Sequence, residues 1–219
     1  SHHRIGFNCG AVFPHYLVPL VDAIRHSNFP EHTDEWSAAL RTFAYGYFLP
    51  ACRANPFLII PNGYFSGHGL LWFCGLGHGL NGAYAWAAAL AIELAQFFND
   101  TAFEEIATGN LQWIAGLNSG LTQESLAGCY HFTADLEPGI AVPVSMIHSI
   151  GSHFAGSWLD IPGSICNGFD VDLQFELEVA PSRENDCPRM FTDEDWITHS
   201  GAWLSALARG RLVTPHVPE

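Results

Sequence analysis

The stretch from Gly69 to Phe98 constrains the fold more than any other part of the chain. Between Gly69 and Ile92 it contains no acidic residue, no Arg and no Lys. In its second half apolar residues recur at helical spacing, at Leu80, Tyr84, Ala87, Ala91, Leu94 and Phe98. The opposite face is also apolar, with Glu93 and Gln96 as the only clearly polar positions. A helix of this kind has to be covered on both sides, so we predict an inner helix of a layered all-α fold.

The same stretch is long enough to cross a bilayer, which is the competing interpretation. Its middle is interrupted by small and polar residues, namely Gly75, Gly77, His78, Gly79, Asn81 and Gly82. No basic residue closely flanks either end, so the signal that orients a membrane span is missing. We therefore expect no membrane partner.

Composition favours one helical domain spanning residues 1–219, because 48% of the residues are apolar and only 14% are charged. The net charge of −14 results from 22 acidic residues against eight arginines, with no lysine. Such a chain repels nucleic acid and anionic membranes, so we expect neither as a partner.

It contains no nucleotide-binding glycine loop and no zinc-ligand spacing among its Cys and His residues, so we expect no cofactor and no metal. Cys52 and Cys74 lie in apolar stretches and are predicted to be buried thiols. The compartment stays open.

The predicted elements follow from periodicity and turn signals. A first helix is expected over 13–27, broken or started near Pro14 and Pro19, and a second from an Asp34 N-cap to a kink or end at Pro50. Further helices are expected over 101–118, after a cap at 99–101, over 145–158 and over 192–209. Residues 28–33 are expected to form a loop, residues 160–190 an irregular excursion with a strand within 174–179, and residues 211–219 a flexible tail.

Three segments together resemble the C-terminal part of the six-hairpin (α/α) toroid glycosidases, closest to glycoside hydrolase family nine. They are GHGLNGAYAWAAALAIEL at 77–94, NLQWIAGLN at 110–118, and NGFDVD at 167–172 followed by TDEDWITHSGAWLSALA at 192–208. The resemblance implies a partial (α/α) toroid of helical hairpins with long loops, belonging to a larger (α/α)6 barrel. It also implies a glycoside hydrolase acting on a poly- or oligosaccharide.

By the same resemblance, the general acid of glycosidic cleavage falls on Asp193 by position or on Glu194 by residue type. Capping of the last helix by Thr192 and these acids is the structural alternative. The family's paired aspartates have no counterpart here. For a second carboxylate the sequence leaves Asp135, Glu137, Asp170 and Asp172 open.

Sugar-binding candidates are aromatic or polar residues beside the inner helix and in the last helix. Aromatic faces stack on sugar rings, which favours Tyr64 and Trp72 as platforms. His78 precedes the inner helix, and His199 lies one turn into the last helix; both are predicted to contact sugar. For Tyr84 and Trp86 a core role is the stronger interpretation.

Two alternatives to the hydrolase stay open. A polysaccharide lyase on the same scaffold needs cations to neutralise a uronate, and eight arginines equip the chain poorly for that. A non-catalytic helical structural or assembly protein fits the missing aspartate pair. The expected partners are therefore a carbohydrate, together with self-association or a complementary chain that completes the barrel.

Overall fold

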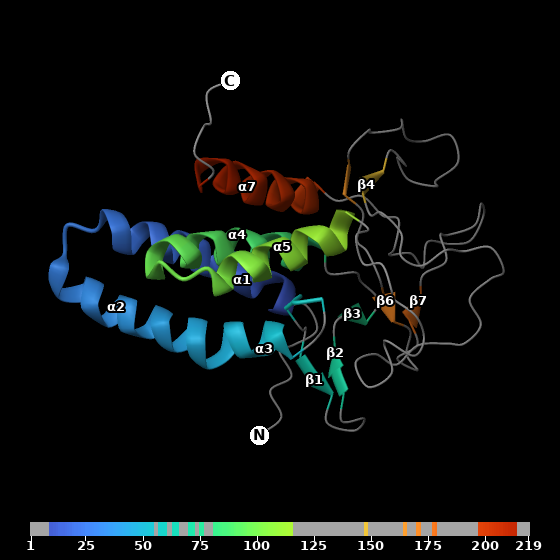
Figure 1. Ribbon diagram of the computed structural model, residues 1–219, viewed down its shortest axis with the longest axis horizontal. Coiled ribbons are helices and arrows are strands. Elements are labelled where there is room, and N and C mark those ends of the chain that lie inside the picture. The colour runs from blue at the N-terminus through green and yellow to red at the C-terminus, as the bar shows by residue number, and fades with distance from the viewer. Residues whose placement is uncertain are drawn as a thin grey trace.

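The computed structural model describes residues 9–54, 57–60, 63–65, 70–72, 75–76, 81–115, 147–148, 164–165, 170–171, 177–178 and 197–213. Side chains are described for residues 17–54, 57–60, 81–115, 165 and 197–210. The five longest helices of this part of the chain are α1 (Cys9–His26), α2 (Pro30–Phe43), α4 (Asn81–Phe98), α5 (Ala102–Ala115) and α7 (Ile197–Val213). They pack together on one side of the molecule (Figure 1).

Helix α4 is the centre of the helical layer. Fourteen of its eighteen residues are buried. It packs against α1, α5 and α7, so it is covered on more than one side (Figure 1). The prediction of an inner helix is confirmed, and with it the all-α character of the packed core.

Helices α4 and α7 run parallel to each other. His199, near the start of α7, contacts Gly82 near the start of α4, and Arg209 near the end of α7 pairs with Glu93 in the last third of α4. Helix α1 runs in the same direction, whereas α2 and α5 run in the opposite one (Figure 1). Three parallel helices are thus accompanied by two antiparallel helices, each joined to the preceding helix by a short connection.

Helix α1 is longer than predicted and continues through Pro14 and Pro19. Proline inside a helix removes one backbone hydrogen bond. Val18, Val21 and Ile24 are buried in the core, and Pro19 is exposed. Packing of the apolar face of α1 stabilises the helix more than the local sequence suggests, so the predicted break is wrong.

Helix α2 begins at Pro30, within the predicted loop, and Asp34 lies inside it rather than capping it. Proline suits the first helical turn, because its missing N–H is not needed there and its φ angle is already helical. At the other end the π-helix η1 (Ala44–Phe48) continues into α3 (Leu49–Arg53). The N–H group of Leu49 donates to the carbonyl of Ala44, so the helical turn just before Pro50 contains one extra residue. The helix does not end at Pro50.

Helix α5 follows its prediction closely. The Oδ1 atom of Asp100 accepts a hydrogen bond from the N–H group of Ala102 at 3.0 Å, which satisfies one of the unpaired donors at the helix start. Apolar residues on one face of the helix, Phe103, Ile106 and Ile114, are fully buried. The predicted cap within 99–101 is confirmed at Asp100.

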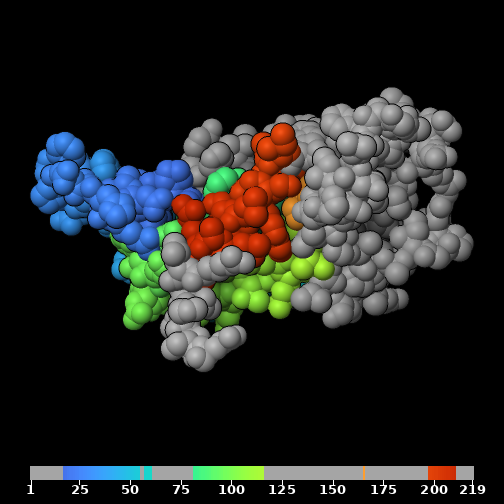
Figure 2. Space-filling model, turned by 90° about the horizontal axis from the view of Figure 1, so that it is seen from above, coloured from blue at the N-terminus to red at the C-terminus, as the bar shows by residue number. Residues whose placement is uncertain are grey.

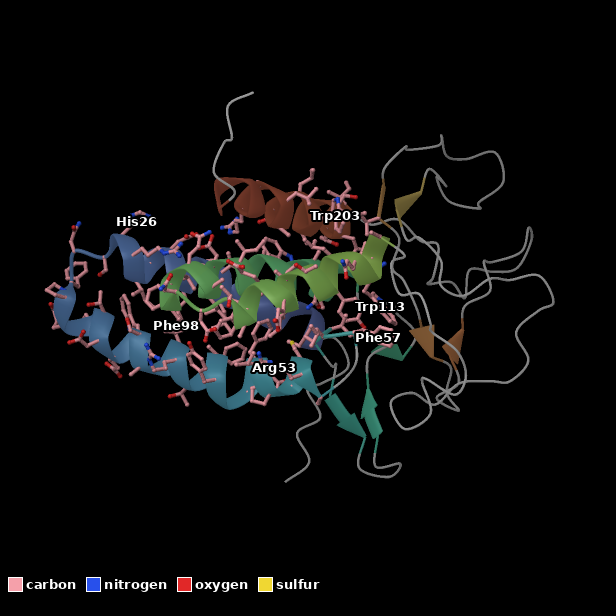
Figure 3. The ribbon with its side chains drawn as sticks, in the orientation of Figure 1. His26, Arg53, Phe57, Phe98, Trp113 and Trp203 are labelled. Atoms are coloured by element: carbon pink, nitrogen blue, oxygen red, sulfur yellow. The ribbon has the colours of Figure 1, made fainter. Side chains whose placement is uncertain are left out.

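Aromatic rings fill the space around α5. Trp113 makes edge contacts with Phe57 and Tyr84, at centroid distances of 5.1 and 6.2 Å (Figure 3). Phe103 stacks on Phe48, which comes from η1. Tyr84 and Cys52 are both buried, as predicted.

The described strands are only two or three residues long. They are β1 (Gly63–Phe65), β2 (Leu70–Trp72), β3 (Gly75–Leu76), β4 (Ile147–His148), β5 (Ser164–Ile165), β6 (Asp170–Val171) and β7 (Leu177–Glu178). They form the antiparallel pairs β1–β2 and β4–β5, and a sheet of order β3-β6-β7 in which β3 pairs parallel with β6. Figure 1 shows them beside the end of the helical layer at which α4 and α7 begin.

These strands and α7 test three predictions from the sequence; two are wrong and one is confirmed. Residues 147–148 form β4, so a helix over 145–158 is wrong there. A strand within 174–179 is confirmed by β7. Helix α7 extends to Val213, so residues 211–213 are helical and do not belong to a flexible tail. The rest of that tail, residues 214–219, lies outside the described residues.

Within the described part of the chain, no helix has both the length and the apolar character needed to cross a membrane.

Candidate functional site

The starts of α4 and α7 lie against each other at the contact between Gly82 and His199. A Cβ atom at Gly82 would overlap Nδ1 of the His199 ring. Only glycine therefore lets the two helices approach this closely here. The His199 side chain is 7% exposed. The structure thus places His199 between two helices, and its predicted contact with sugar stays a prediction.

The short strands attach distant parts of the chain to this end of the helices. Ser200, in the first turn of α7, accepts a hydrogen bond at its Oγ atom from the N–H group of Ile165 in β5, at 3.4 Å. Gly75 of β3, six residues before α4, lies in register with Asp170 of β6. Segments near residues 75, 165 and 170 are therefore brought toward the starts of α4 and α7.

The two aromatic platform candidates belong to one hairpin. Tyr64 in β1 is paired with Leu71, and Trp72 at the end of β2 is paired with Gly63. Their backbones thus occupy neighbouring positions in the same two-stranded ribbon, although 8 residues separate them in the sequence. Their side chains are not among the described ones. His78, Asp193 and Glu194 lie outside the described residues altogether.

Asn110 of α5 fixes the segment that leads into this hairpin. Its Nδ2 atom donates hydrogen bonds to the carbonyls of Leu58 and Ile106, at 3.0 and 2.8 Å. Its Oδ1 atom accepts a hydrogen bond from the N–H group of Ile60 at 3.4 Å. Leu58 has a φ angle of 58°, which is a strained backbone conformation for a residue with a side chain. A fully buried amide therefore holds a turn whose strained residue lies five positions before the start of β1.

Gly109, the neighbour of Asn110, allows this turn to sit directly on α5. A Cβ atom at Gly109 would overlap the carbonyl oxygen of Phe57. Asn110 belongs to the motif at 110–118, but its role in holding this turn was not predicted from the sequence. The signal available was a polar amide in line with the apolar stripe of a helix, since buried amides are almost always fully hydrogen bonded.

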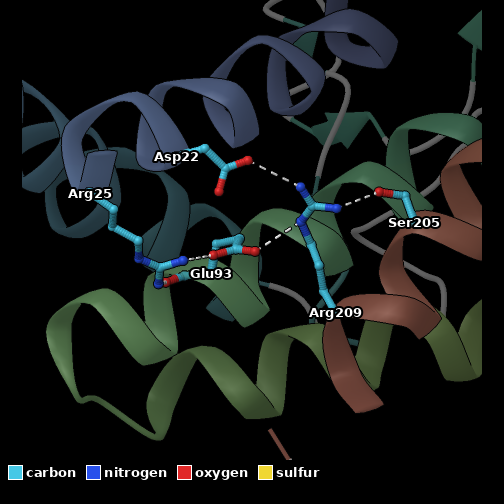
Figure 4. A network of polar contacts seen from close by, with 5 residues as sticks. All are labelled: Asp22, Arg25, Glu93, Ser205 and Arg209. Atoms are coloured by element: carbon cyan, nitrogen blue, oxygen red, sulfur yellow. Dashed lines mark hydrogen bonds and ion pairs between the residues drawn. The ribbon is translucent and has the colours of Figure 1, made fainter. Parts of the chain in front are cut away.

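An ion-pair network centred on the buried carboxylate of Glu93 joins α1, α4 and α7 (Figure 4). Glu93, in the middle of the network, has a side chain that is 7% exposed. Its Oε2 atom pairs with Arg25 of α1, which also donates to the backbone carbonyl of Glu93 at 3.2 Å. Its Oε1 atom lies 2.9 Å from Nε of Arg209 in α7. One carboxylate thus holds two arginines from helices on either side of α4.

Arg209 has two further partners in this network. It donates to Oγ of Ser205 at 2.9 Å and pairs with Oδ2 of Asp22 at 3.3 Å (Figure 4). Two acids therefore neutralise two arginines, which satisfies the requirement that a buried charge be paired. Glu93 stands out in the sequence as an acid in an apolar helix, but its pairing with Arg25 and Arg209 was not predicted.

A smaller cluster closes the opposite end of the helical layer. The Tyr45 hydroxyl donates to Oδ2 of Asp100 at 3.0 Å, and the Arg41 guanidinium lies 4.6 Å from the ring centroid of Phe98. Burial, and then the hydrogen bond to Asp100, raise the pKa of Tyr45. Asn99, with a φ angle of 51°, makes the tight turn between α4 and α5 here. This cluster stabilises a turn and shows no feature of a binding site.

The outer face of α7 is apolar and exposed. Ile197 is 92% exposed, Leu204 63% and Leu207 37%. A Cβ atom at Gly201, on the same face, would have no neighbour within 4 Å. Figure 2 shows α7 lying open on this side of the molecule.

Among the described residues, no group of three or more His, Cys, Asp or Glu side chains could hold a metal ion. Comparisons of the chain with known protein families, with characterised proteins and with solved structures find no match.

Proposed function

We propose that this chain is a carbohydrate-active protein of the (α/α) toroid class that hydrolyses glycosidic bonds, and that it forms part of a larger (α/α)6 barrel. The observation that carries the proposal is the parallel arrangement of α1, α4 and α7 with their starts at one end of the layer, with α2 and α5 running in the opposite direction (Figure 1). Alternating antiparallel helices with a parallel inner set are what a toroid of helical hairpins requires.

The sequence positions of the candidate residues support a site at this same end. Helix α4 begins three residues after His78, and α7 begins three residues after Glu194. The contact between Gly82 and His199 joins the starts of these two helices. The hairpin that contains Tyr64 and Trp72 lies between α3 and α4 in the chain, and the turn that precedes it is tied to α5 through Asn110.

The chemistry needs two carboxyl groups. Asp193 or Glu194 donates a proton to the leaving glycosidic oxygen while the bond to the anomeric carbon breaks. A second carboxylate takes a proton from the water that attacks this carbon, and in an inverting enzyme the two carboxyl groups stand about 6.5–9.5 Å apart. Of the four candidates, Asp170 is favoured, because its backbone pairs with Gly75 in the strand that precedes α4. Tyr64 and Trp72 are proposed to stack on the sugar rings.

The experiment is to assay the purified chain on a panel of plant and microbial glycans, alone and with Asp193→Asn, Glu194→Gln and Asp170→Asn variants. Removing a general acid or base is expected to lower turnover by about 10²–10⁴-fold. Asp34→Asn is the matched control, because Asp34 is an exposed carboxylate on α2. Wild-type inactivity on every glycan, or full activity of all three variants, would contradict the proposal. An unsaturated product would identify a lyase instead.

A second candidate is a non-catalytic assembly protein, which is favoured by the exposed apolar face of α7. We propose a second copy of this chain as the occupant of that face. The described residues of the face, Ile197, Gly201, Leu204 and Leu207, carry no charge, so two copies meet there without the repulsion that the net charge of −14 causes elsewhere.

Light scattering separates this candidate from a monomeric enzyme. The wild-type chain is expected to be a dimer, and Leu204→Glu a monomer. Ala39→Glu is the control, since it adds the same charge at an exposed position of α2. A monomeric wild type, or dimers that persist in the Leu204→Glu variant, would exclude self-association through α7.

A further inference from the structure

We infer that the ion pair between Arg209 and Glu93 sets the axial position of α7 along α4, and thereby acts as a positioning contact for the residues at the start of α7. The link to catalysis rests on the proposed function, because Asp193 and Glu194 precede α7 by four and three residues in the chain. The structural link does not depend on it.

Small residues make up much of the interface between α4 and α7, and at its far end Ile92 of α4 lies beside Gly210 of α7. Ala202 and Ala206 of α7 are fully buried, and they face a helix in which seven of the fourteen buried residues are alanine. Small side chains let two helices approach closely, but they form only shallow ridges and grooves. A slide of one residue displaces a helix by about 1.5 Å, and such a surface opposes it weakly.

Two contacts, one near each end of the interface, supply the missing specificity. Near the start, His199 fits against Gly82; toward the end, Arg209 pairs with Glu93 at 2.9 Å. The contacts lie ten residues apart on α7 and eleven apart on α4, which corresponds to about 15 and 16.5 Å of helix. These lengths agree within one residue, so a single axial alignment of α7 along α4 allows both contacts to form.

The Arg209 guanidinium is itself held in place, which makes it suitable for setting a position. Ser205 lies one turn before it on α7 and accepts a hydrogen bond at 2.9 Å, and Asp22 of α1 pairs with it at 3.3 Å. Its side chain is only 24% exposed. A long side chain fixed at three points transmits the position of Glu93 to α7, whereas a freely rotating one would not.

Glu93 provides its own matched control, because it binds two arginines from different helices. Arg209→Met removes the tie to α7 and leaves Glu93 paired with Arg25. Arg25→Met removes the tie to α1 and leaves Glu93 paired with Arg209. Each variant keeps the carboxylate paired with one arginine, so both are expected to fold and to lose similar stability. Only Arg209→Met should alter the start of α7.

The first readout is hydrogen exchange of the amides at 197–206, measured on the full chain. Arg209→Met is expected to speed exchange there on the order of tenfold, and Arg25→Met by less than about threefold. Arg209→Lys keeps the charge but not the geometry of the guanidinium, and should lie between wild type and Arg209→Met. It also serves as the folded variant if Arg209→Met does not fold. Equal exchange in the Arg209 and Arg25 variants would overturn the inference.

The second readout is turnover on whichever glycan the wild-type chain cleaves. Misplacing a catalytic group by about 1 Å can cost a factor on the order of 100 in rate, so Arg209→Met should lower kcat at least tenfold. KM should stay within about twofold, because the proposed sugar platform lies on β1 and β2, and Arg25→Met should leave both nearly unchanged. An inactive wild type would count against the proposed function alone, since hydrogen exchange tests the positioning contact without a substrate.

Discussion

Gly82 of α4 and His199 of α7 lie so close that a single added methyl group at Gly82 would overlap the imidazole ring. His199 is 7% exposed, so the ring cannot simply swing into solvent. The starts of the two helices can therefore lie this close only because Gly82 has no side chain.

We expect Gly82→Ala to destabilise the fold by about 1–3 kcal/mol, the usual cost of overpacking a well-packed interior. The free energy of unfolding by chemical denaturation measures this. In a His199→Ala background the same change should cost much less, because the clash is then removed. Additive losses in the double variant would show that the two residues are not in conflict.

Gly201→Ala is the matched control for this prediction. Gly201 is also a helical glycine of the α4–α7 pair, but it is exposed and has open space around its Cα atom. Alanine there should stabilise the protein by about 0.5–1 kcal/mol through helix propensity alone. Opposite signs at Gly82 and Gly201 would locate the effect in packing.

The central helix could be predicted because its signal is local. The apolar residues of 80–98 recur at helical spacing on nearly all sides, and such a helix can only be buried. The same reasoning fails for Glu93, since its partners Arg25 and Arg209 lie 68 and 116 residues away in the sequence. A lone acid in an apolar helix indicates that a partner exists, but not which of eight arginines it is.

The predicted break at Pro14 and Pro19 is wrong because burial of Val18 and Val21 stabilises the helix more than the prolines destabilise it. At Pro50 the chain stays helical to Arg53 after the π-helix η1, so an end of the helix there is wrong, and a kink stays a prediction. For the candidate site, the pairing of Gly75 with Asp170 is similarly long-range, so no spacing rule could have predicted it.

Asn110 should be the polar residue of α5 that is most sensitive to substitution. Asn110→Leu removes the partners of buried backbone groups at Leu58 and Ile60, at about 1–3 kcal/mol for each group left unpaired. Thermal unfolding of this variant, compared with Gln112→Ala at an exposed position of the same helix, measures the effect. A shift no larger than that of Gln112→Ala would mean that the turn does not depend on this amide.

The two kinds of ion pair in this protein should respond very differently to truncation. Glu93→Ala removes the buried carboxylate that pairs with two partly buried arginines, and is expected to cost about 3–5 kcal/mol. Glu105→Ala breaks the exposed pair between Arg53 and Glu105, in which the charged atoms lie 3.7 Å apart and the side chains are 50% and 66% exposed. This change should cost less than about 1 kcal/mol. Denaturation at low and high salt supplies a further check, because salt screens the exposed pair and hardly affects the buried one. Comparable losses in the two variants would contradict the buried network.

Stability should fall at alkaline pH through two groups next to each other near η1. Burial raises the pKa of the Cys52 thiol, and burial followed by the proximity of Cys52 raises the pKa of Tyr47 to about 12. Both groups are neutral when protonated, so the folded state binds their protons more tightly than the unfolded state does. Their contribution is complete below the ordinary pKa values of 9.0 and 10.0 and is lost as the pH rises toward 12. Melting temperatures measured between pH 8 and pH 11 should decline in the wild type. They should decline less in a Cys52→Ala/Tyr47→Phe double variant, which lacks both groups. An identical decline in the two proteins would assign the effect to other groups.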